Sequence, residues 1–395
     1  MANTLNLGNG NWAAKEGSLL AYNNENGNFK PLPFDFTRAS SATRVNSQGL
    51  IEVVGIDQPR VDYSSGEGAL LLEPSRTNSI PYSEDFSSWQ GSDFGTLTGG
   101  QTGFDGSNNA WLYEYTSNNA AIVQQSNTSS GVQTLSVFAK GSVNNGIRLY
   151  AFGTSNANTY FDLNLGIVEG TSGTISNSIE DYGNGWYRCS MTFDQTNSII
   201  NLYLSNNSNS LASTGSAYIQ YAQLEQGSYA TSYIPTSGAA VTRVAEACNG
   251  AGNEDIFNDS EGVLFAEISA VNEATPKRIS ISDGTTNEVV DLRVVASELL
   301  CVVIVGGTAQ ATLSYSQATI SDFNKIALKY KTNDFALWVN GFEVATDISG
   351  STPSGLDILN FDRGTGTINF YGNCKDIRVY NTALTDEQLA ALTTI

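Results

Sequence analysis

Residues 218–243, YIQYAQLEQGSYATSYIPTSGAAVTR, divide the chain into two β-rich parts. The segment first interleaves apolar Ile219, Tyr221 and Leu224 with polar glutamines, which is the period-two pattern of a half-buried strand. At Gly227 this pattern gives way to a connector that contains a proline and several aromatic residues. The sequence therefore predicts that one β module ends here and that another begins.

Composition supports the same interpretation. The 395 residues exceed the length of one ordinary sandwich, and a hydrophobic fraction of 40% allows packed cores. Only 15% of the residues are charged, whereas Asn, Ser, Thr and Gly are abundant, which favours turns and short strands over helices. We expect an all-β protein with two tandem antiparallel β-sandwich (jelly-roll) domains after a small β-rich N-terminal segment. The expected boundaries are residues 1–81, 82–236 and 241–395.

Short apolar or alternating runs, each bounded by turn residues, mark the candidate strands. They lie at residues 50–54, 60–63, 69–72, 111–115, 132–140, 147–152, 160–165, 185–193, 199–204, 217–224, 262–270, 277–283, 288–295, 299–305, 325–331, 335–347 and 375–380. A short helix is predicted over residues 386–392, because Thr385 and Gln388 have the spacing of a capping box.

The dipeptide Asn340-Gly341 gives the sharpest local prediction. A two-residue Asn-Gly loop favours a type I′ hairpin turn. It would place Val339 opposite Phe342, and Leu337 opposite Val344.

Two residue types limit the chemistry. The chain has no histidine, which excludes Ser-His-Asp triads, HExxH zinc sites and histidine general bases. Its four cysteines are far apart and form no CxxC pair, so no zinc knuckle or redox motif is visible. We interpret them as buried apolar residues, and a disulfide between Cys248 and Cys374 is the alternative.

The formal charge of −20 argues against a nucleic-acid partner, because phosphate contacts need clustered Lys and Arg. No apolar run is long enough to cross a bilayer, so membrane insertion is not expected. Residues 1–10 lack the basic start and apolar core of a signal peptide. We therefore expect synthesis in a cytoplasm.

Several segments resemble known families. GNGWYRCSMTF and AQLEQGSYATSYIPTSGAAVTR resemble parts of a carbohydrate-binding-module-like jelly roll found in bacteriophage structural proteins. KDIRVYNTALTDEQLAAL, together with LWVNG, resembles the end of concanavalin A-like and laminin-G-like sandwich domains. FDFTRASSATRVNSQGLIEVV, PRVDY and GALLLEPSRTN resemble a leader that is common to phage tail and virion proteins.

The resemblance implies a bacteriophage virion protein, a tail fibre or fibre-like adhesin on the particle surface, which binds host surface glycans and other virion proteins. The resemblance to fibre proteins also implies a homotrimer. One alternative is a capsid decoration or head-fibre protein that binds mainly virion proteins. Another is a secreted polysaccharide-binding protein, which would need an export signal.

Sugar binding requires aromatic rings for stacking beside amide and carboxylate side chains for the hydroxyl groups. Trp89 begins a loop and is expected to be the most exposed tryptophan. Aromatic residues also build sandwich cores, so a core position is the alternative role for every candidate residue. The candidate residues are Trp89, Trp111, Tyr113, Tyr115, Tyr150 and Tyr160.

Scarce positive charges gather near the N-terminus. They could dock an acidic virion partner or form salt bridges with the chain's own carboxylates. The residues are Arg38, Arg44, Arg60 and Arg76.

Catalysis and metal binding have weaker support. Calcium is common in both resembled families, and Asp255, Asp259 and Glu261 offer oxygen ligands, but no EF-hand spacing appears and we predict no metal site. Concanavalin-like glycosidases carry an E-x-D-x-x-E strand motif that is missing here, so we expect no enzymatic activity.

Overall fold

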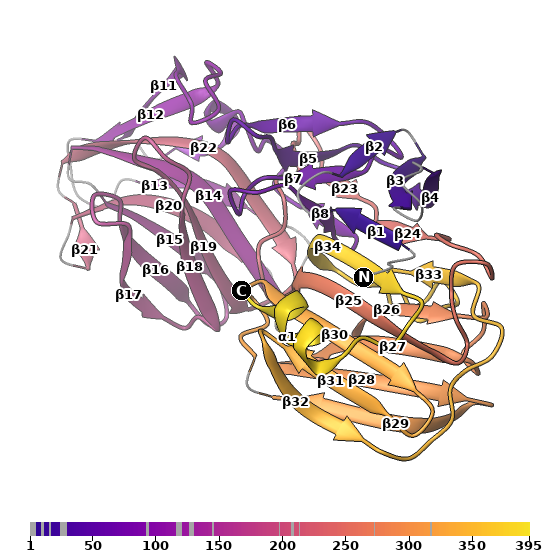
Figure 1. Ribbon diagram of the computed structural model, residues 1–395. Helices are drawn as coiled ribbons and strands as arrows, with labels where there is room; N and C mark the ends of the chain where they lie inside the picture. Colours follow the sequence, from indigo (N-terminus) through magenta and orange to yellow (C-terminus); the bar gives the residue numbers. More distant parts are fainter. Residues whose placement is uncertain are drawn as a thin grey trace. The chain divides into compact units, whose positions relative to one another are not determined.

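Figure 1 shows the computed structural model. It describes residues 5–8, 12–15, 17–23, 30–91, 95–115, 121–125, 130–143, 146–196, 198–206, 209–212, 214–271, 273–316 and 318–395. In this part of the chain the regular structure is β-strand, apart from helix α1 (Asp386–Thr393) and the 3-10 turn η2 (Phe86–Ser88). The chain forms two compact units, which we call the central unit (residues 48–52 and 75–243) and the terminal unit (residues 1–47, 53–74 and 244–395).

The central unit contains two antiparallel sheets. The first has the order β10-β13-β20-β15-β16-β17, with β21 beside β20, and the second has the order β11-β12-β22-β14-β19-β18. Strands β9 and β23 pair with each other. The bounds are β9 (Arg76–Asn78), β10 (Gln90–Gly91), β11 (Gly95–Gln101), β12 (Ala110–Tyr115), β13 (Ala121–Gln125), β14 (Val132–Val143), β15 (Gly146–Phe152), β16 (Ala157–Asp162), β17 (Ile167–Ser172), β18 (Ser176–Asp181), β19 (Trp186–Asp194), β20 (Ile199–Asn206), β21 (Ser210–Leu211), β22 (Gly215–Gln226) and β23 (Val241–Arg243).

The two sheets of the central unit enclose one apolar core. Leu135 and Val137 from β14 belong to the same buried cluster as Leu149 from β15 and Leu202 from β20. These side chains alternate along their strands with residues that face away from the core, as expected for a sandwich.

The outer face of the second sheet is also covered. Phe138, which breaks the polar pattern of its strand, is buried in a second aromatic cluster with Trp186 and Tyr221. Its ring stacks on Phe104 with centroids 4.5 Å apart.

The terminal unit is a second antiparallel sandwich. Its larger sheet has the order β24-β4-β3-β1-β34-β25-β30-β31-β32, with β2, β7 and β8 attached, and its smaller sheet has the order β29-β28-β27-β26-β33. The core contains residues of both sheets. The bounds are β1 (Leu5–Gly8), β2 (Ala13–Lys15), β3 (Ser18–Asn23), β4 (Lys30–Thr37), β7 (Arg60–Asp62), β8 (Ala69–Leu72), β24 (Ala247–Asn249), β25 (Glu261–Ser269), β26 (Lys277–Ser282), β27 (Val289–Val295), β28 (Glu298–Val305), β29 (Thr308–Tyr315), β30 (Asn324–Lys331), β31 (Phe335–Val339), β32 (Phe342–Asp347), β33 (Ile358–Asn360) and β34 (Gly372–Tyr380). Two further strands are β5 (Ala42–Val45) and β6 (Ile51–Val54).

The N-terminal strands do not form the separate segment that the sequence suggested. Strands β1 and β8 both pair with β34, near the C-terminus. Residues 1–47 and 53–74 therefore complete the terminal unit, whereas residues 75–81 belong to the central unit. The expected boundary at residue 81 is therefore wrong. Residues 1–47 and 53–74 belong to the terminal unit because their strands pair with a strand near the C-terminus, although they are far from it in the sequence.

Two local predictions can be compared with the structure. The hairpin forms at Asn340-Gly341, with positive φ at both residues, and Val339 pairs with Phe342. Leu337, however, pairs with Ala345 and not with Val344, because a register shift lies between Leu337 and Trp338.

All four cysteines are free and buried, as the interpretation of them as apolar residues predicts. Within the described residues, no helix combines the length and the apolar character that a membrane crossing requires.

Candidate functional site

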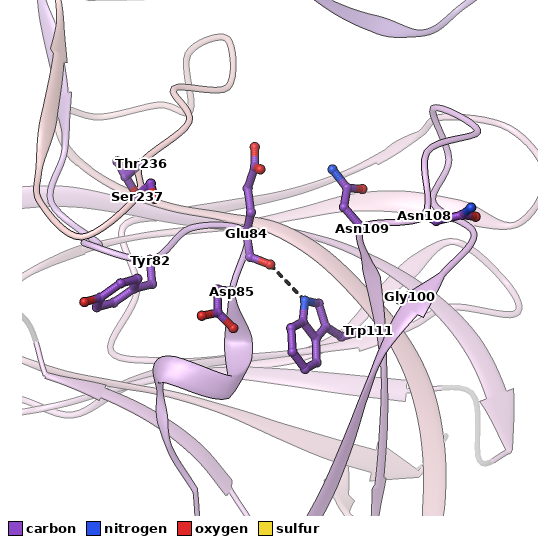
Figure 2. A pocket seen from close by; sticks show the side chains of 9 residues that line it. All are labelled: Tyr82, Glu84, Asp85, Gly100, Asn108, Asn109, Trp111, Thr236 and Ser237. Carbon is purple, nitrogen blue, oxygen red and sulfur yellow. Dashed lines mark hydrogen bonds between the residues drawn. The ribbon is translucent and has the colours of Figure 1, made fainter.

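A pocket of about 380 Å³ opens in the central unit. Figure 2 shows its lining, with the side chains of Glu84 and Asn109 directed to the same side and the indole of Trp111 below Glu84. The lining residues come from the start of the unit, from β11 and β12, and from the connector near its end. They are Tyr82, Glu84, Asp85, Gly100, Asn108, Asn109, Trp111, Thr236 and Ser237.

The two ends of the central unit meet at this pocket. Tyr82 forms an antiparallel bridge with Ser237. Beside it, the Ser83 amide donates to Thr236 Oγ1 at 2.9 Å, and the Thr236 amide donates to Ser83 Oγ at 2.8 Å. These reciprocal bonds hold one wall of the pocket against the other.

Trp111 is fixed in place from two sides. Its indole Nε1 donates to the backbone carbonyl of Glu84 at 2.8 Å (Figure 2). On the neighbouring strand, a Cβ at Gly99 would lie 3.1 Å from the indole ring, so the glycine leaves room for it. The half-buried ring therefore packs against Gly99 and is hydrogen-bonded to the backbone of Glu84.

Glu84 is a titratable residue of this pocket whose pKa is raised. Burial raises the pKa of its carboxyl, a hydrogen bond from Tyr233 opposes that shift, and nearby Asp105 adds to it. Oε1 accepts the Tyr233 hydroxyl at 3.1 Å. Oε2 has no donor among the described residues, which leaves it able to accept a hydrogen bond from a ligand.

Other polar side chains at the pocket differ in whether they already form hydrogen bonds within the chain. The Asp85 carboxylate accepts bonds from Ser87 and Ser88, and these lower its pKa. Asn109 is bonded to the hydroxyl of Tyr221. The exposed side chains of Asn108 and Ser237 have no hydrogen-bond partner within the described chain.

This combination has a clear chemical consequence. The rings of Tyr82 and Trp111 supply apolar surface, while Glu84 Oε2, the Asn108 amide and the Ser237 hydroxyl supply hydrogen-bonding groups. A flat ligand with many hydroxyl groups can use both kinds of surface.

The candidate aromatic residues do not gather at this pocket. Trp111 lines it, but Trp89 is only 4% exposed, so its expected exposure is wrong. The Trp89 ring packs on Phe86, with centroids 5.0 Å apart, and its Nε1 donates to the Tyr82 carbonyl at 2.8 Å. Trp89 therefore supports the backbone of the pocket from inside the core.

Tyr113 and Tyr115 are also in the core and cannot stack on a sugar. They share one face of β12, as predicted, but this face points inward and leaves them 1% and 2% exposed. The Tyr115 hydroxyl donates to the carbonyl of Leu204 at 2.7 Å, and burial raises its pKa to about 12.

Tyr150 and Tyr160 lie on the face of the first sheet that points away from the core. Both are half-buried and surround Arg148. Neither tyrosine lines the pocket, so the two residues belong to a different surface.

The proposed docking face of four arginines is not present. Arg38 and Arg60 are 1% and 0% exposed, and both pair with Glu246, so they cannot contact a partner. Arg76 lies 3.7 Å from Glu225 and its guanidinium stacks on a tyrosine ring. Arg44 is half-buried. Salt bridges with the chain's own carboxylates, the alternative interpretation, apply to Arg38, Arg60 and Arg76.

Two of the three acidic residues that offered oxygen ligands for calcium already have other partners. Asp259 uses both oxygens for backbone amides, of Gly355 at 2.7 Å and Leu356 at 2.9 Å. Glu261 pairs with Lys331 at 2.9 Å. Calcium needs several free oxygen ligands around one point, and these two side chains are already committed elsewhere.

The sequence did not indicate Tyr82, Glu84, Asn108 or Ser237 as site residues. The available signal was positional, since YSEDFSSW opens the module and the connector after Gly227 closes it. Only strand pairing shows that these two ends meet.

No family model matches the chain, and no curated protein matches it. Among solved structures, the CBM40 of a Ruminococcus gnavus IT-sialidase bound to alpha2,3 sialyllactose is similar with a TM-score of 0.32 and 20% identity, over 37% of this chain and 93% of that chain. Domains LG4-5 of the mouse laminin alpha1 chain have a TM-score of 0.26 and 12% identity, over 75% of this chain and 96% of that chain. At these TM-scores, the assignment of two β-sandwiches stands on the chain's own strand pairing and cores.

Proposed function

We propose that the central unit binds glycans in the pocket lined by Tyr82, Glu84, Asn108 and Trp111. One observation carries this proposal: the residues that line this pocket include two aromatic side chains and three polar groups without a partner among the described residues, Glu84 Oε2, Asn108 and Ser237. A sugar ring offers an apolar face for the aromatic residues and hydroxyl groups for the polar ones.

The charge of the pocket selects among sugars. Glu84 and Asp85 bring two carboxyl groups to the lining, and no Lys or Arg is among the lining residues. A carboxylate accepts hydrogen bonds from hydroxyl groups but repels an anion. The pocket therefore favours neutral saccharides, and its volume of about 380 Å³ lies at the lower end of the range for small-ligand sites.

We further propose that the chain is a structural protein of a bacteriophage particle, a tail fibre or fibre-like adhesin on the virion surface. The support is the resemblance of residues 34–54 to a leader of phage tail and virion proteins, and of the first module to a jelly roll found in phage structural proteins. Several copies on one particle, for example in a trimer, would convert weak single-site binding into strong attachment. The proposed role is binding without turnover of the glycan.

Glycan binding is tested with the purified full chain on an array of bacterial polysaccharides and neutral oligosaccharides, followed by calorimetry with the ligands found. Glu84→Gln and Asn108→Ala should each weaken binding. The matched controls are Glu114→Gln, an exposed glutamate on the same strand as Trp111, and Asn164→Ala, an exposed asparagine on a distant loop. Absence of binding by the multimerised chain, or equal binding by all four variants, would reject the site.

The role in the particle needs its own experiment. Antibody against the purified chain should label the tail of intact phage particles in electron micrographs. Labelling of the head would favour the capsid-decoration alternative, and unlabelled particles would reject a virion role. Release of smaller sugars from a bound oligosaccharide would contradict the proposal that the glycan is not turned over.

A further inference from the structure

Arg148 lies at the centre of an aromatic patch on the outer face of the first sheet of the central unit. In the strand register it stands between Tyr203 on β20 and Tyr160 on β16, and Tyr150 follows it on its own strand. Figure 1 shows these three strands side by side. The guanidinium carbon is 4.2 Å from the ring centroid of Tyr150 and 5.2 Å from those of Tyr160 and Tyr203.

The same face continues beyond the arginine. Asn201 and Asn158 flank Tyr150 on the two neighbouring strands. Phe152, which is 50% exposed, extends the aromatic row, with its centroid 6.3 Å from that of Tyr150. We call Arg148, Tyr150, Tyr160, Tyr203 and Phe152 the arginine-tyrosine platform.

None of the described carboxylates forms an ion pair with Arg148. The protein has 39 acidic and 19 basic residues, so carboxylates that could pair with an arginine are abundant. Two other half-buried arginines, Arg278 and Arg293, both pair with Asp291. The guanidinium of Arg148 has neither an ion pair nor a hydrogen bond to any described residue, and its Nε is buried without a partner.

These features favour an anion with an attached ring. Stacking on tyrosine stabilises a guanidinium but satisfies none of its N–H groups. A carboxylate or sulfate would accept those N–H groups in charge-assisted bonds, and the tyrosine rings beside it would support a sugar ring. Single-stranded nucleic acid also uses aromatic residues, but it needs a basic groove along its backbone, and this platform has one positive charge.

We infer that the arginine-tyrosine platform is a second binding surface, specific for acidic saccharides, that is, sugars carrying a carboxylate or a sulfate group. It shares with the proposed function only the idea that the central unit binds glycans. Its charge preference is opposite to that of the acidic pocket, and it shares no residue with it. One unit would then present a neutral-sugar site and an acidic-sugar site, which increases avidity for a polysaccharide that contains both.

The test compares ligands that differ only in charge. The full chain is titrated with oligogalacturonate and with its fully methyl-esterified form, which keeps the ring but removes the negative charge. A second pair, sulfated and unsulfated dextran oligosaccharides, distinguishes a sulfate ester from a carboxylate as the bound anion. We expect tighter binding of the charged member of at least one pair, and weaker binding of that member as salt concentration rises.

Substitutions then locate the binding. Arg148→Gln should weaken acidic binding by about tenfold or more, whereas Arg148→Lys, which keeps the charge, should retain part of it. Tyr160→Phe should bind as the unaltered chain does, and Tyr160→Ala more weakly, because stacking uses the ring and not the hydroxyl. The control is Arg363→Gln in the terminal unit, and circular dichroism verifies folding of each variant.

Two results would overturn the inference: equal affinity for charged and uncharged members of both pairs, or unchanged acidic binding in Arg148→Gln. The pocket is tested separately with Glu84→Gln, which should weaken neutral but not acidic binding. Loss of neutral binding alone in Glu84→Gln is the expected result and supports two independent surfaces. Loss of acidic binding in Glu84→Gln would show that the two surfaces are not independent and would also overturn the inference.

Discussion

Arg60 Nε donates a hydrogen bond of 2.8 Å to Glu246 Oε1 across 186 positions of the chain. Glu246 also accepts from Arg38 at 2.7 Å, and Arg60 pairs with Glu73 at 2.8 Å. The four side chains form a buried ionic cluster inside the terminal unit. Burial would lower the pKa of Arg60, but the carboxylates of Glu246 and Glu73 raise it above the usual value, so Arg60 stays charged. The cluster joins the segment before the central unit to the segment after it.

Glu246→Gln should destabilise the terminal unit by about 3–5 kcal/mol, because it leaves Arg38 and Arg60 buried with one carboxylate fewer. Unfolding in urea, followed by tryptophan fluorescence and circular dichroism, measures the change. The Arg60 side chain is fully buried, so water cannot replace the lost partner.

Glu67→Gln is the matched control for this variant. Glu67 also pairs with a basic residue, Lys375, but its side chain is 72% exposed. The midpoint of unfolding should stay unchanged, since surface pairs contribute little. An equal midpoint for Glu246→Gln would contradict a structural role for the cluster.

A second prediction concerns pH. Because burial raises the pKa of Glu84, its carboxyl stays protonated above the ordinary value of 4.5. The folded chain holds this proton more tightly than the unfolded chain, so Glu84 makes stability fall as pH rises between 4.5 and the raised pKa. Binding of a neutral sugar should show the opposite trend, since deprotonation converts the carboxyl from a group with one donor oxygen into a stronger acceptor on both oxygens.

Calorimetry at several pH values across the range of carboxyl titration tests this dependence. The unaltered chain should bind the neutral sugar more tightly as pH rises through the Glu84 pKa, and Glu84→Gln should give weaker binding with a flatter profile. The Glu114→Gln control should reproduce the profile of the unaltered chain. An identical slope in Glu84→Gln would assign the pH dependence to another group.

Local sequence patterns were informative where neighbouring residues decide the structure. The Asn340-Gly341 turn formed because both residues tolerate positive φ. The helix began at Asp386 after the cap residue Thr385, as the capping box predicted. The register beyond Trp338 could not be predicted, because the shift depends on pairing that the turn does not determine.

The candidate site was harder to predict, because alternation along a strand shows which residues share a face but not which face is buried. Tyr113 and Tyr115 share a face that is the core, whereas Tyr150 and Tyr160 share one that is not. Glu84 gave no signal, because its importance depends on a pocket closed by residues about 150 positions later.

A third prediction separates a core role from a binding role for Tyr115. Tyr115→Phe removes the hydroxyl that donates to the Leu204 carbonyl at 2.7 Å, and it should lower the free energy of unfolding by about 1 kcal/mol. Glycan affinity should not change, because the ring is in the core. Thermal unfolding and calorimetry measure the two effects, and a variant with normal stability and weaker glycan binding would restore Tyr115 as a site residue.

The last prediction tests the start of helix α1. Thr385 accepts a hydrogen bond from the Gln388 amide, and the Gln388 side chain accepts one from the Thr385 amide at 3.0 Å. The helix has only eight residues, so it depends on this cap and on the burial of Leu389. Thr385→Ala should therefore cost about 1 kcal/mol in the unfolding of the terminal unit, whereas Thr385→Ser, which keeps the hydroxyl, should cost much less. Denaturant titration of both variants gives the comparison, and equal losses would mean that the methyl group of Thr385, and not its hydroxyl, stabilises this end of the chain.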